Sequence, residues 1–564
     1  MEADVPRHAY GLTSFIIAFL TLCPARLLPK ACGLAESTGP GGSNAQTVHQ
    51  IGYFGQDVNV GLISADNIRT SHEAFYDKDS NGTPTGQTHA FNYDFTGGGI
   101  QTSNHDTAVA GIVASRAGIS HPNDIGVAPG VDIHSARVVD DNDTIKSEYL
   151  LNALDELITV QDCRVIVTGI ALPSNPNGES FWSLLYDYYA YKYDTVFANA
   201  AGNNGSKIAV FGDAYNGITT GGLILNDPNN EYIYREVGDI SGSGPTSDGR
   251  RKPDVAGPSE KQTVPQAGSD TAWTTLAANL GQTSYSTPHV AGTAALLLSL
   301  ADDTVEVNDS QNEVIRAVIV NSAFPNIDDK NGAWTNPADS NNTWNSDRGY
   351  GRIDALRAYQ TLNAGRITRN IPSTQMAGWA FEGIDSNGQP NSVHTYEIYA
   401  EKAERLRATL TWDRRVRWYA GNLEGFRANL DLEIQEPNSR VVIFSEENNN
   451  LDPNDNLEKC DLLLSKTGEY LIKVVNKSPD ESPDYGLAFE ILPSIPGDFE
   501  PMDYKVDTLD LAKFTNWWLR DDCSGLNDWC EGADLEPADS RVDLADFARF
   551  AGHWLENDPA YCQP

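Results

Sequence analysis

Ser284 lies in the segment whose residue types are best suited to catalysis, Thr283-Ser-Tyr-Ser-Thr-Pro-His-Val-Ala-Gly292. Acyl transfer to a serine requires a hydroxyl nucleophile, a base for its proton, a group that orients the base, and donors for the oxyanion. We predict that a helix begins here, because Pro288 is tolerated in a first turn and Val290–Leu298 is apolar. A hydroxyl at a helix N-terminus lies near the positive end of the helix dipole. The alternative interpretation of this segment alone, less favoured, is a Ser/Thr-rich cap on a core helix.

Two further segments contain residue types that suit the other roles. Asn104-His105-Asp-Thr-Ala-Val-Ala-Gly111 contains a histidine at the start of a small-residue run. Asn199-Ala-Ala-Gly-Asn-Asn-Gly205 follows the apolar run Thr195–Phe197 and contains Asn203. Taken singly, the histidine is typical of a helix cap and the asparagines of a turn at a strand end.

Together and in this order, the three segments resemble the subtilase family of serine peptidases. The resemblance implies that Ser284 is the nucleophile, His105 the general base and Asn203 the side-chain donor to the oxyanion. It covers about residues 46–362 and includes further family-like segments. These segments are Gly126–Gly130, Gly212–Asn216, Ser243–Ala256 and Gly349–Ala355.

The sequence departs from the family pattern where the third member of the triad is expected. The family has an apolar strand that runs directly into an aspartate, whereas Val58-Asn-Val-Gly-Leu-Ile63 runs into Ser64. The register places Ser64 in the aspartate position and leaves Asp66 as an alternative acid. Asp106 also replaces the glycine that usually follows the histidine. Losing the triad aspartate costs about 10⁴ in kcat, so a weak serine endopeptidase and a catalytically silent binding or scaffold protein are both open.

The chain divides into three regions that differ in the pattern of their apolar residues. The first contains the candidate catalytic residues, and the other two follow it. Residues 46–362 alternate apolar runs of strand length with helical patterns, which predicts an α/β domain with a mostly parallel sheet. The runs are Val109–Ala114, Val165–Ile170 and Thr195–Ala201, with a long helix at Val290–Leu300. Residues 370–494 show period-2 alternation, as at Leu406, Ala408, Leu410 and Trp412, which predicts an all-β sandwich resembling a jelly roll.

Residues 497–560 contain an internal repeat with an offset of 36 residues. Hard cations such as Ca²⁺ prefer several oxygen ligands, so carboxylates spaced along a loop and onto the next helix predict two calcium sites. The candidate ligands are Asp498, Glu500, Asp503, Asp507 and Asp510 in the first copy, and Asp534, Glu536, Asp539, Asp543 and Asp546 in the second. The pair resembles a small helical type I dockerin, which implies docking to a cohesin-like or cell-surface partner.

Composition narrows the classes of partner and compartment. The net charge of −38 argues against nucleic acid as a partner, because phosphate binding needs a basic face. The cysteines form no CxxC pair, so a zinc site is not expected, and Cys523, Cys530 and Cys562 are close enough in sequence to supply one disulfide. The pairing stays open at this point.

The N-terminal residues 1–40 resemble a leader. The apolar run Leu12–Leu22 follows Arg7 and His8, and its length suits a signal peptide better than a membrane-spanning helix. We therefore expect a secreted or cell-surface protein that acts on a protein or peptide substrate. We expect no membrane span beyond the leader and no organic cofactor.

Overall fold

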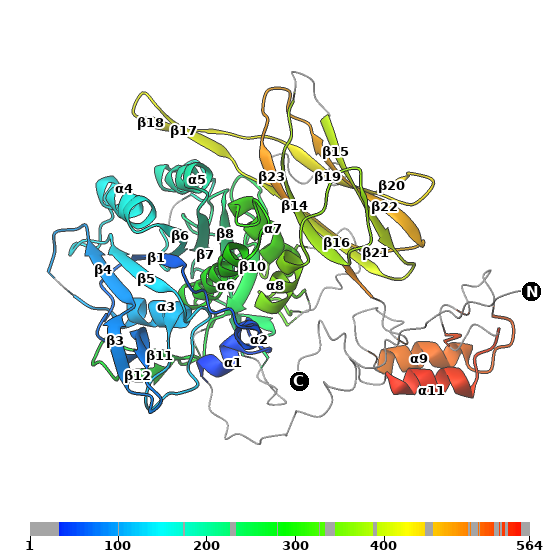
Figure 1. Cartoon of the computed structure of the whole chain (residues 1–564), viewed down its shortest axis with the longest axis horizontal. Helices are drawn as coiled ribbons and strands as arrows, with labels where there is room; N and C mark the ends of the chain where they lie inside the picture. The colour runs from blue at the N-terminus through cyan, green and yellow to red at the C-terminus, as the bar shows by residue number, and fades with distance from the viewer. Residues whose placement is uncertain are drawn as a thin grey trace, which may run out of the picture. The chain divides into compact units, whose positions relative to one another are not determined.

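A computed structural model describes most of the chain (Figure 1). The described residues are 33–99, 101–172, 175–225, 233–278, 280–325, 327–332, 344–386, 392–445, 455–493, 497, 506, 508–523, 530, 533–535 and 540–553. The predicted leader run Leu12–Leu22 lies outside them.

The first large body contains an eight-stranded sheet whose seven main strands are parallel, as predicted. Its strand order is β10-β8-β7-β6-β1-β5-β4, and β9 (Glu236–Val237) pairs antiparallel with β8. The other strands are β1 (Asn59–Ser64), β4 (Ala90–Asp94), β5 (Asp132–Arg137), β6 (Cys163–Thr168), β7 (Val196–Ala200), β8 (Gly217–Ile224) and β10 (Val255–Pro258).

Helices cover both faces of this sheet, because alternate strand residues are apolar on both sides. In β6, Val165 and Val167 lie in the buried cluster that includes α3 and α6, whereas Ile166 lies in the cluster of α4 and α5. The helices are α1 (Leu34–Thr38), α2 (Ala45–Ile51), α3 (Asn104–Ala114), α4 (Ser147–Leu154), α5 (Phe181–Tyr193), α6 (Thr283–Asp303), α7 (Asn312–Asn321) and α8 (Ala355–Asn363).

Short elements complete this body. A π-helical turn, Asp155–Val160, continues α4, and a 3-10 turn, Glu73–Phe75, precedes β2. Two small antiparallel pairs lie outside the main sheet. They are β2 (Tyr76–Lys78) with β3 (Pro84–Thr88), and β11 (Thr263–Pro265) with β12 (Trp273–Thr275).

One sequence-based prediction about this body is wrong. The run Val109–Ala114, taken as a strand, forms the second half of α3, because a short run of small and branched apolar residues suits a buried helix equally well. Within the predicted leader range 1–40, Leu34 is fully buried in the core, and its N–H donates to Asp124 Oδ1 at 2.9 Å.

Residues 372–492 form the predicted β-sandwich from a five-stranded and a four-stranded sheet around one core. The sheet orders are β13-β15-β22-β19-β20 and β14-β23-β16-β21. Their strands are β13 (Pro372–Ser373), β14 (Ala377–Gly383), β15 (Ser392–Ala400), β16 (Arg405–Trp412), β19 (Leu430–Gln435), β20 (Val442–Ser445), β21 (Leu457–Leu463), β22 (Gly468–Asn476) and β23 (Asp484–Leu492). A hairpin, β17 (Arg415–Tyr419) and β18 (Asn422–Phe426), extends from β16.

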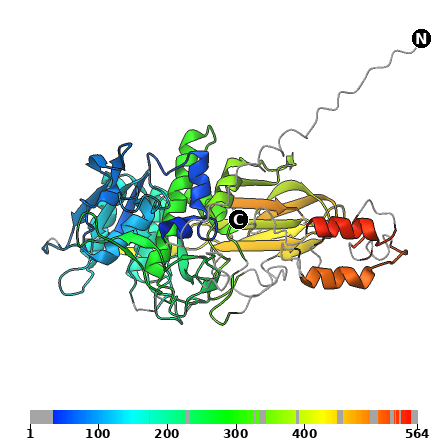
Figure 2. The same cartoon turned by 90° about the horizontal axis from the view of Figure 1, so that it is seen from below.

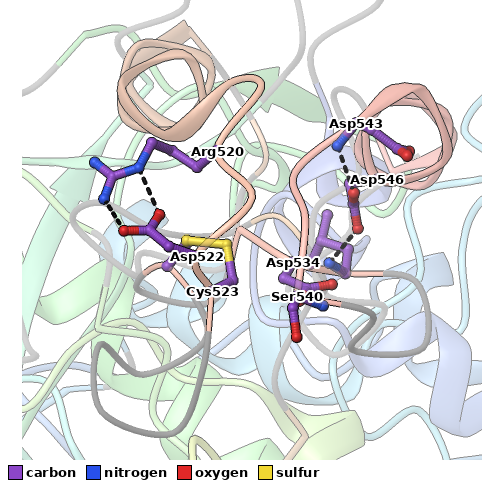
Figure 3. Close-up of a disulfide and its surroundings, with 9 residues drawn as sticks. Arg520, Asp522, Cys523, Asp534, Ser540, Asp543 and Asp546 are labelled. Atoms are coloured by element: carbon purple, nitrogen blue, oxygen red, sulfur yellow. Dashed lines mark hydrogen bonds and ion pairs between the residues drawn. A yellow bond between two sulfur atoms is a disulfide. The ribbon is translucent and has the colours of Figure 1, made fainter.

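The C-terminal region contains two helices, α9 (Thr508–Trp517) and α11 (Leu544–Gly552), which lie alongside each other (Figure 2). The rings of Phe514 and Phe550, which are matched positions of the internal repeat, stack with centroids 5.0 Å apart. Cys523 and Cys530 form a disulfide between the two helices in sequence (Figure 3). This bond selects one of the pairings that the sequence left open.

Candidate active site

The predicted catalytic residues lie at the edge of the main sheet where its parallel strands end. Ser64 is the last residue of β1, and Asn203 follows the end of β7. His105 and Ser284 each occupy the first turn of a helix, α3 and α6 respectively. Ligand sites in open parallel sheets commonly form at this carboxyl edge, where loops and helix N-termini converge.

His105 and Ser284 are in direct hydrogen-bond contact although 179 residues separate them. The imidazole Nε2 lies 2.8 Å from Ser284 Oγ, and the Ser284 residue is only 4% exposed. The His105 ring lies beside Gly169, where an added Cβ would approach Cε1 to 3.7 Å. The imidazole therefore contacts the hydroxyl on one edge, and a Cβ at position 169 would meet the ring at an ordinary van der Waals distance.

A second histidine in the same segment does not compete for this role. His289 is fully buried, and its Nδ1 and Nε2 lie 3.0 Å from Ser43 Oγ and Gln262 Oε1 respectively. Burial lowers the pKa of His289 to about 3. This ring is a hydrogen-bonded core residue.

Asn203 lies next to the same helix turn, with its amide orientation fixed. Its Oδ1 accepts hydrogen bonds from the Thr283 backbone N–H at 2.8 Å and from Thr283 Oγ1 at 3.0 Å. A backbone N–H can only donate, so the atom facing it must be the oxygen. The Nδ2 donors of this exposed residue have no partner among the residues that the structure describes, which leaves them available to a ligand.

Ser64 fills the strand position predicted for the triad aspartate but does not approach the imidazole. Its side chain is fully buried, and its Oγ accepts a hydrogen bond from Ser135 Oγ at 3.0 Å, on the neighbouring strand β5. Within the described part of the chain, Ser64 and His105 share no hydrogen bond. Ser64 is thus the last residue of β1, and its hydroxyl bonds to β5.

The alternative acid, Asp66, shares no hydrogen bond or ion pair with His105 among the described residues. Its carboxylate lies 3.5 Å from the Nε of Arg137, a side chain that is 2% exposed. Burial raises the pKa of Asp66, and the nearby Asp106 carboxylate adds to this effect. The ion-pair partner of the Asp66 carboxylate among the described residues is therefore Arg137.

The carboxylate that does reach the imidazole belongs to Asp106, which sequence reasoning noted only as a replaced glycine. Asp106 Oδ1 lies 3.3 Å from His105 Nδ1, and Asp106 Oδ2 accepts the Asp66 backbone N–H at 3.0 Å. The Asp106 side chain is 2% exposed. An acid directly after a candidate catalytic histidine was the signal that could have identified this contact.

Four of the ten predicted calcium ligands lie within the described residues, namely Asp510, Asp534, Asp543 and Asp546. Asp546 Oδ1 and Oδ2 accept the backbone N–H groups of Leu535 and Asp543 at 2.6 and 2.8 Å, and Asp534 Oδ2 accepts the Ser540 N–H at 3.0 Å (Figure 3). Among the described residues, no group of three acidic, histidine or cysteine side chains is arranged to hold a metal ion. The ligands Asp498, Glu500, Asp503, Asp507, Glu536 and Asp539 lie outside the described residues.

None of the helices in the described ranges combines the length and apolar character that a bilayer crossing requires.

Comparison with known proteins identifies a family for most of the α/β body. The family model described as the Subtilase family matches residues 55–351, more than half of the 564-residue chain. The membrane-bound transcription factor site-1 protease from Homo sapiens is 24% identical over 269 residues, which make up 46% of this chain and 22% of that relative. The chain thus spans about a fifth of the length of this curated relative.

Two solved structures are also similar to the chain. They are the prenylagaramide maturation protease PagA, 19% identical, and the patellamide maturation protease PatA, 20% identical, each with a TM-score of 0.42. The similarity covers 56% and 55% of this chain, respectively, and 98% of each of those chains.

Proposed function

Because this chain belongs to the subtilase family of serine peptidases, we propose that it is a serine endopeptidase that hydrolyses peptide bonds in proteins or peptides. Ser284 is the nucleophile and His105 the general base and acid of this proposal. Asn203 contributes a side-chain donor to the oxyanion.

The reaction proceeds through an acyl-enzyme in two balanced steps. Ser284 Oγ forms a bond to the scissile carbonyl carbon while its proton passes to His105 Nε2. The same proton then passes to the peptide nitrogen, and the C–N bond breaks to release the amine. Water next attacks the ester, gives one proton to Nε2 and releases the acid as that proton returns to Ser284 Oγ.

Two features of the site favour the negatively charged intermediate. The Asn203 amide presents its Nδ2 side, because Thr283 occupies its Oδ1. Ser284 stands in the first turn of α6, a 21-residue helix whose N-terminal dipole favours developing negative charge.

The observation that carries the proposal is the 2.8 Å contact between His105 Nε2 and Ser284 Oγ. Proton transfer requires heavy atoms at about 2.6–3.2 Å, and this pair already meets that limit without substrate.

Hydrolysis of an unfolded protein such as casein by the purified full chain tests the proposal. Ser284→Ala is expected to abolish turnover, because it removes the nucleophilic oxygen. Ser286→Ala is the matched control: Ser286 lies in the same helix turn and donates to the Thr283 carbonyl at 2.9 Å. Turnover that survives in Ser284→Ala would contradict the mechanism.

A second candidate function is binding without cleavage, by a subtilase-fold protein that has no catalytic activity. Ser64 in the aspartate position favours this reading, since a neutral hydroxyl there brings no charge to stabilise an imidazolium. Absence of turnover, together with binding of casein or peptides, would support it.

We also propose that the protein is exported and that residues 497–560 bind Ca²⁺ and dock to a cohesin-like or cell-surface partner. The Cys523–Cys530 disulfide supports an oxidising compartment.

The repeated acidic loops support the calcium proposal, since Asp534 and Asp546 are each less than 10% exposed. Calcium would crosslink each loop to its following helix through such carboxylates. Loss of thermal stability on chelation with EGTA tests it.

A further inference from the structure

We propose that Asp106 is the positioning residue that orients His105 and balances its charge, in place of the strand-end aspartate that this chain lacks. The inference rests on the proposed peptidase function, because it assigns the missing third member of that site. It moves the acid from the end of β1 to the residue that follows the histidine on α3.

The first argument is the placement of the Asp106 carboxylate. Its Oδ1 lies 3.3 Å from His105 Nδ1, on the opposite side of the ring from the 2.8 Å contact with Ser284. A carboxylate can only accept a hydrogen bond, so this contact holds the ring proton on Nδ1. The lone pair of Nε2 then faces the Ser284 hydroxyl, as the proton transfer requires.

The second argument is that Asp106 is held in place by contacts from two directions. The Asp66 N–H donates to Oδ2 at 3.0 Å, and the Asp106 backbone N–H donates to Ser103 Oγ, the cap of α3, at 3.1 Å. The residue also stands in the first turn of α3, where the helix dipole favours a negative charge. These contacts fix the buried Asp106 carboxylate beside the imidazole of His105.

The third argument is that the other candidates are committed elsewhere. Ser64 accepts from Ser135, and the Asp66 carboxylate lies against Arg137. Arg137 also pairs with Asp94 at 3.3 Å and with Asp141 at 2.7 Å. Its positive charge is therefore shared among carboxylates other than Asp106. Among the described residues, Asp106 is the acid in contact with His105.

The distance of 3.3 Å fits a site without substrate. Catalytic hydrogen bonds are often long or poorly aligned in free enzymes and tighten in the complex. When the Ser284 proton reaches Nε2, the imidazole becomes cationic and its attraction to the adjacent carboxylate increases. Asp106 would then stabilise the imidazolium without itself receiving the proton.

Steady-state kinetics on the full chain test the role. Asp106→Asn keeps the size of the side chain and an oxygen that accepts the Asp66 N–H, and we expect kcat to fall about 10⁴-fold with KM nearly unchanged. Asp66→Asn is the matched control, since it removes a neighbouring carboxylate that does not touch His105. A partly exposed charge of this kind is expected to change kcat less than about fivefold. Full activity in Asp106→Asn, or a larger loss in Asp66→Asn, would overturn the inference.

A measurement that does not need turnover separates this inference from the peptidase proposal. We would label the chain with ¹⁵N-histidine, identify the His105 ring signals by their loss in His105→Gln, and read which nitrogen carries the proton of the neutral ring. The inference predicts an Nδ1–H ring in the wild type and loss of that preference in Asp106→Asn but not in Asp66→Asn. An Nε2–H ring in the wild type would refute the role of Asp106. If casein is not cleaved while Nδ1–H is observed, the peptidase proposal fails and the positioning contact stands.

Discussion

Replacing Arg414 should lower the free energy of unfolding more than most substitutions. This residue belongs to the β-sandwich, and its positively charged side chain binds residues of the α/β body. It follows β16, its side chain is 1% exposed, and its guanidinium lies 4.0 Å from the centroid of the Tyr215 ring. Its Nε donates to Asp187 Oδ2 at 2.9 Å, and Nη2 contacts the same oxygen. Nη2 also donates to the Gly178 carbonyl at 2.7 Å.

The magnitude follows from the burial of both partners. The Asp187 side chain is fully buried, so Arg414→Ala would leave its carboxylate without a countercharge. Breaking a buried ion pair by removing one partner costs about 3–5 kcal/mol in the free energy of unfolding. The adjacent Arg415 is the matched control. It is 47% exposed and pairs with Glu481 at 3.2 Å, so Arg415→Ala should cost less than about 1 kcal/mol.

Urea unfolding followed by tryptophan fluorescence measures both variants in the full chain. Arg414→Ala should shift the transition far more than Arg415→Ala. Combining Arg414→Met with Asp187→Asn should give a coupling energy above about 1 kcal/mol, since the pair acts as one unit. Equal shifts for Arg414→Ala and Arg415→Ala would refute the claim that this charge joins the sandwich to the α/β body.

Three further predictions concern the site, the pH response and the C-terminal region. Asn203→Ala should lower kcat about 10²–10³-fold while Ser284 remains reactive, and unchanged turnover would remove Asn203 from the oxyanion role. Burial raises the pKa of Asp194 to about 6, so the stability that its protonated form contributes is complete below about pH 4 and is lost as the pH rises through about 6. Asp194→Asn should flatten that decline in thermal unfolding curves, and an unchanged pH profile would contradict it. Asp546→Ala should abolish any rise in melting temperature caused by Ca²⁺, whereas Asp522→Ala, at an exposed side chain paired with Arg520, should preserve it.

Much of the architecture was predictable because buried strands and helices require apolar residues at characteristic spacings in the sequence. The run into Ser64 placed that residue correctly at the end of β1, since its apolar residues match a strand buried on both faces. The same reasoning failed at Val109–Ala114, because a short apolar run of small and branched residues fits a buried helix as well as a strand.

The side-chain arrangement of the site was harder to predict. Nothing in the order of residues says that the Asp106 carboxylate turns back onto the preceding imidazole, because that depends on the helix cap and on the Asp66 N–H. The alternation in β16 predicted its strand correctly, but its polar residues are not solvated. Arg407 is fully buried and pairs with Asp461 and Glu490, since α7 packs on that sheet.

The most direct test of the account is whether Ser284 is an activated nucleophile. A fluorophosphonate reacts with such a serine by forming an Oγ–P bond and releasing fluoride, and mass spectrometry of the digested protein locates the adduct. The account predicts one adduct per chain on Ser284, lost in His105→Gln although the hydroxyl remains. An unmodified Ser284 in the folded wild-type protein would contradict it.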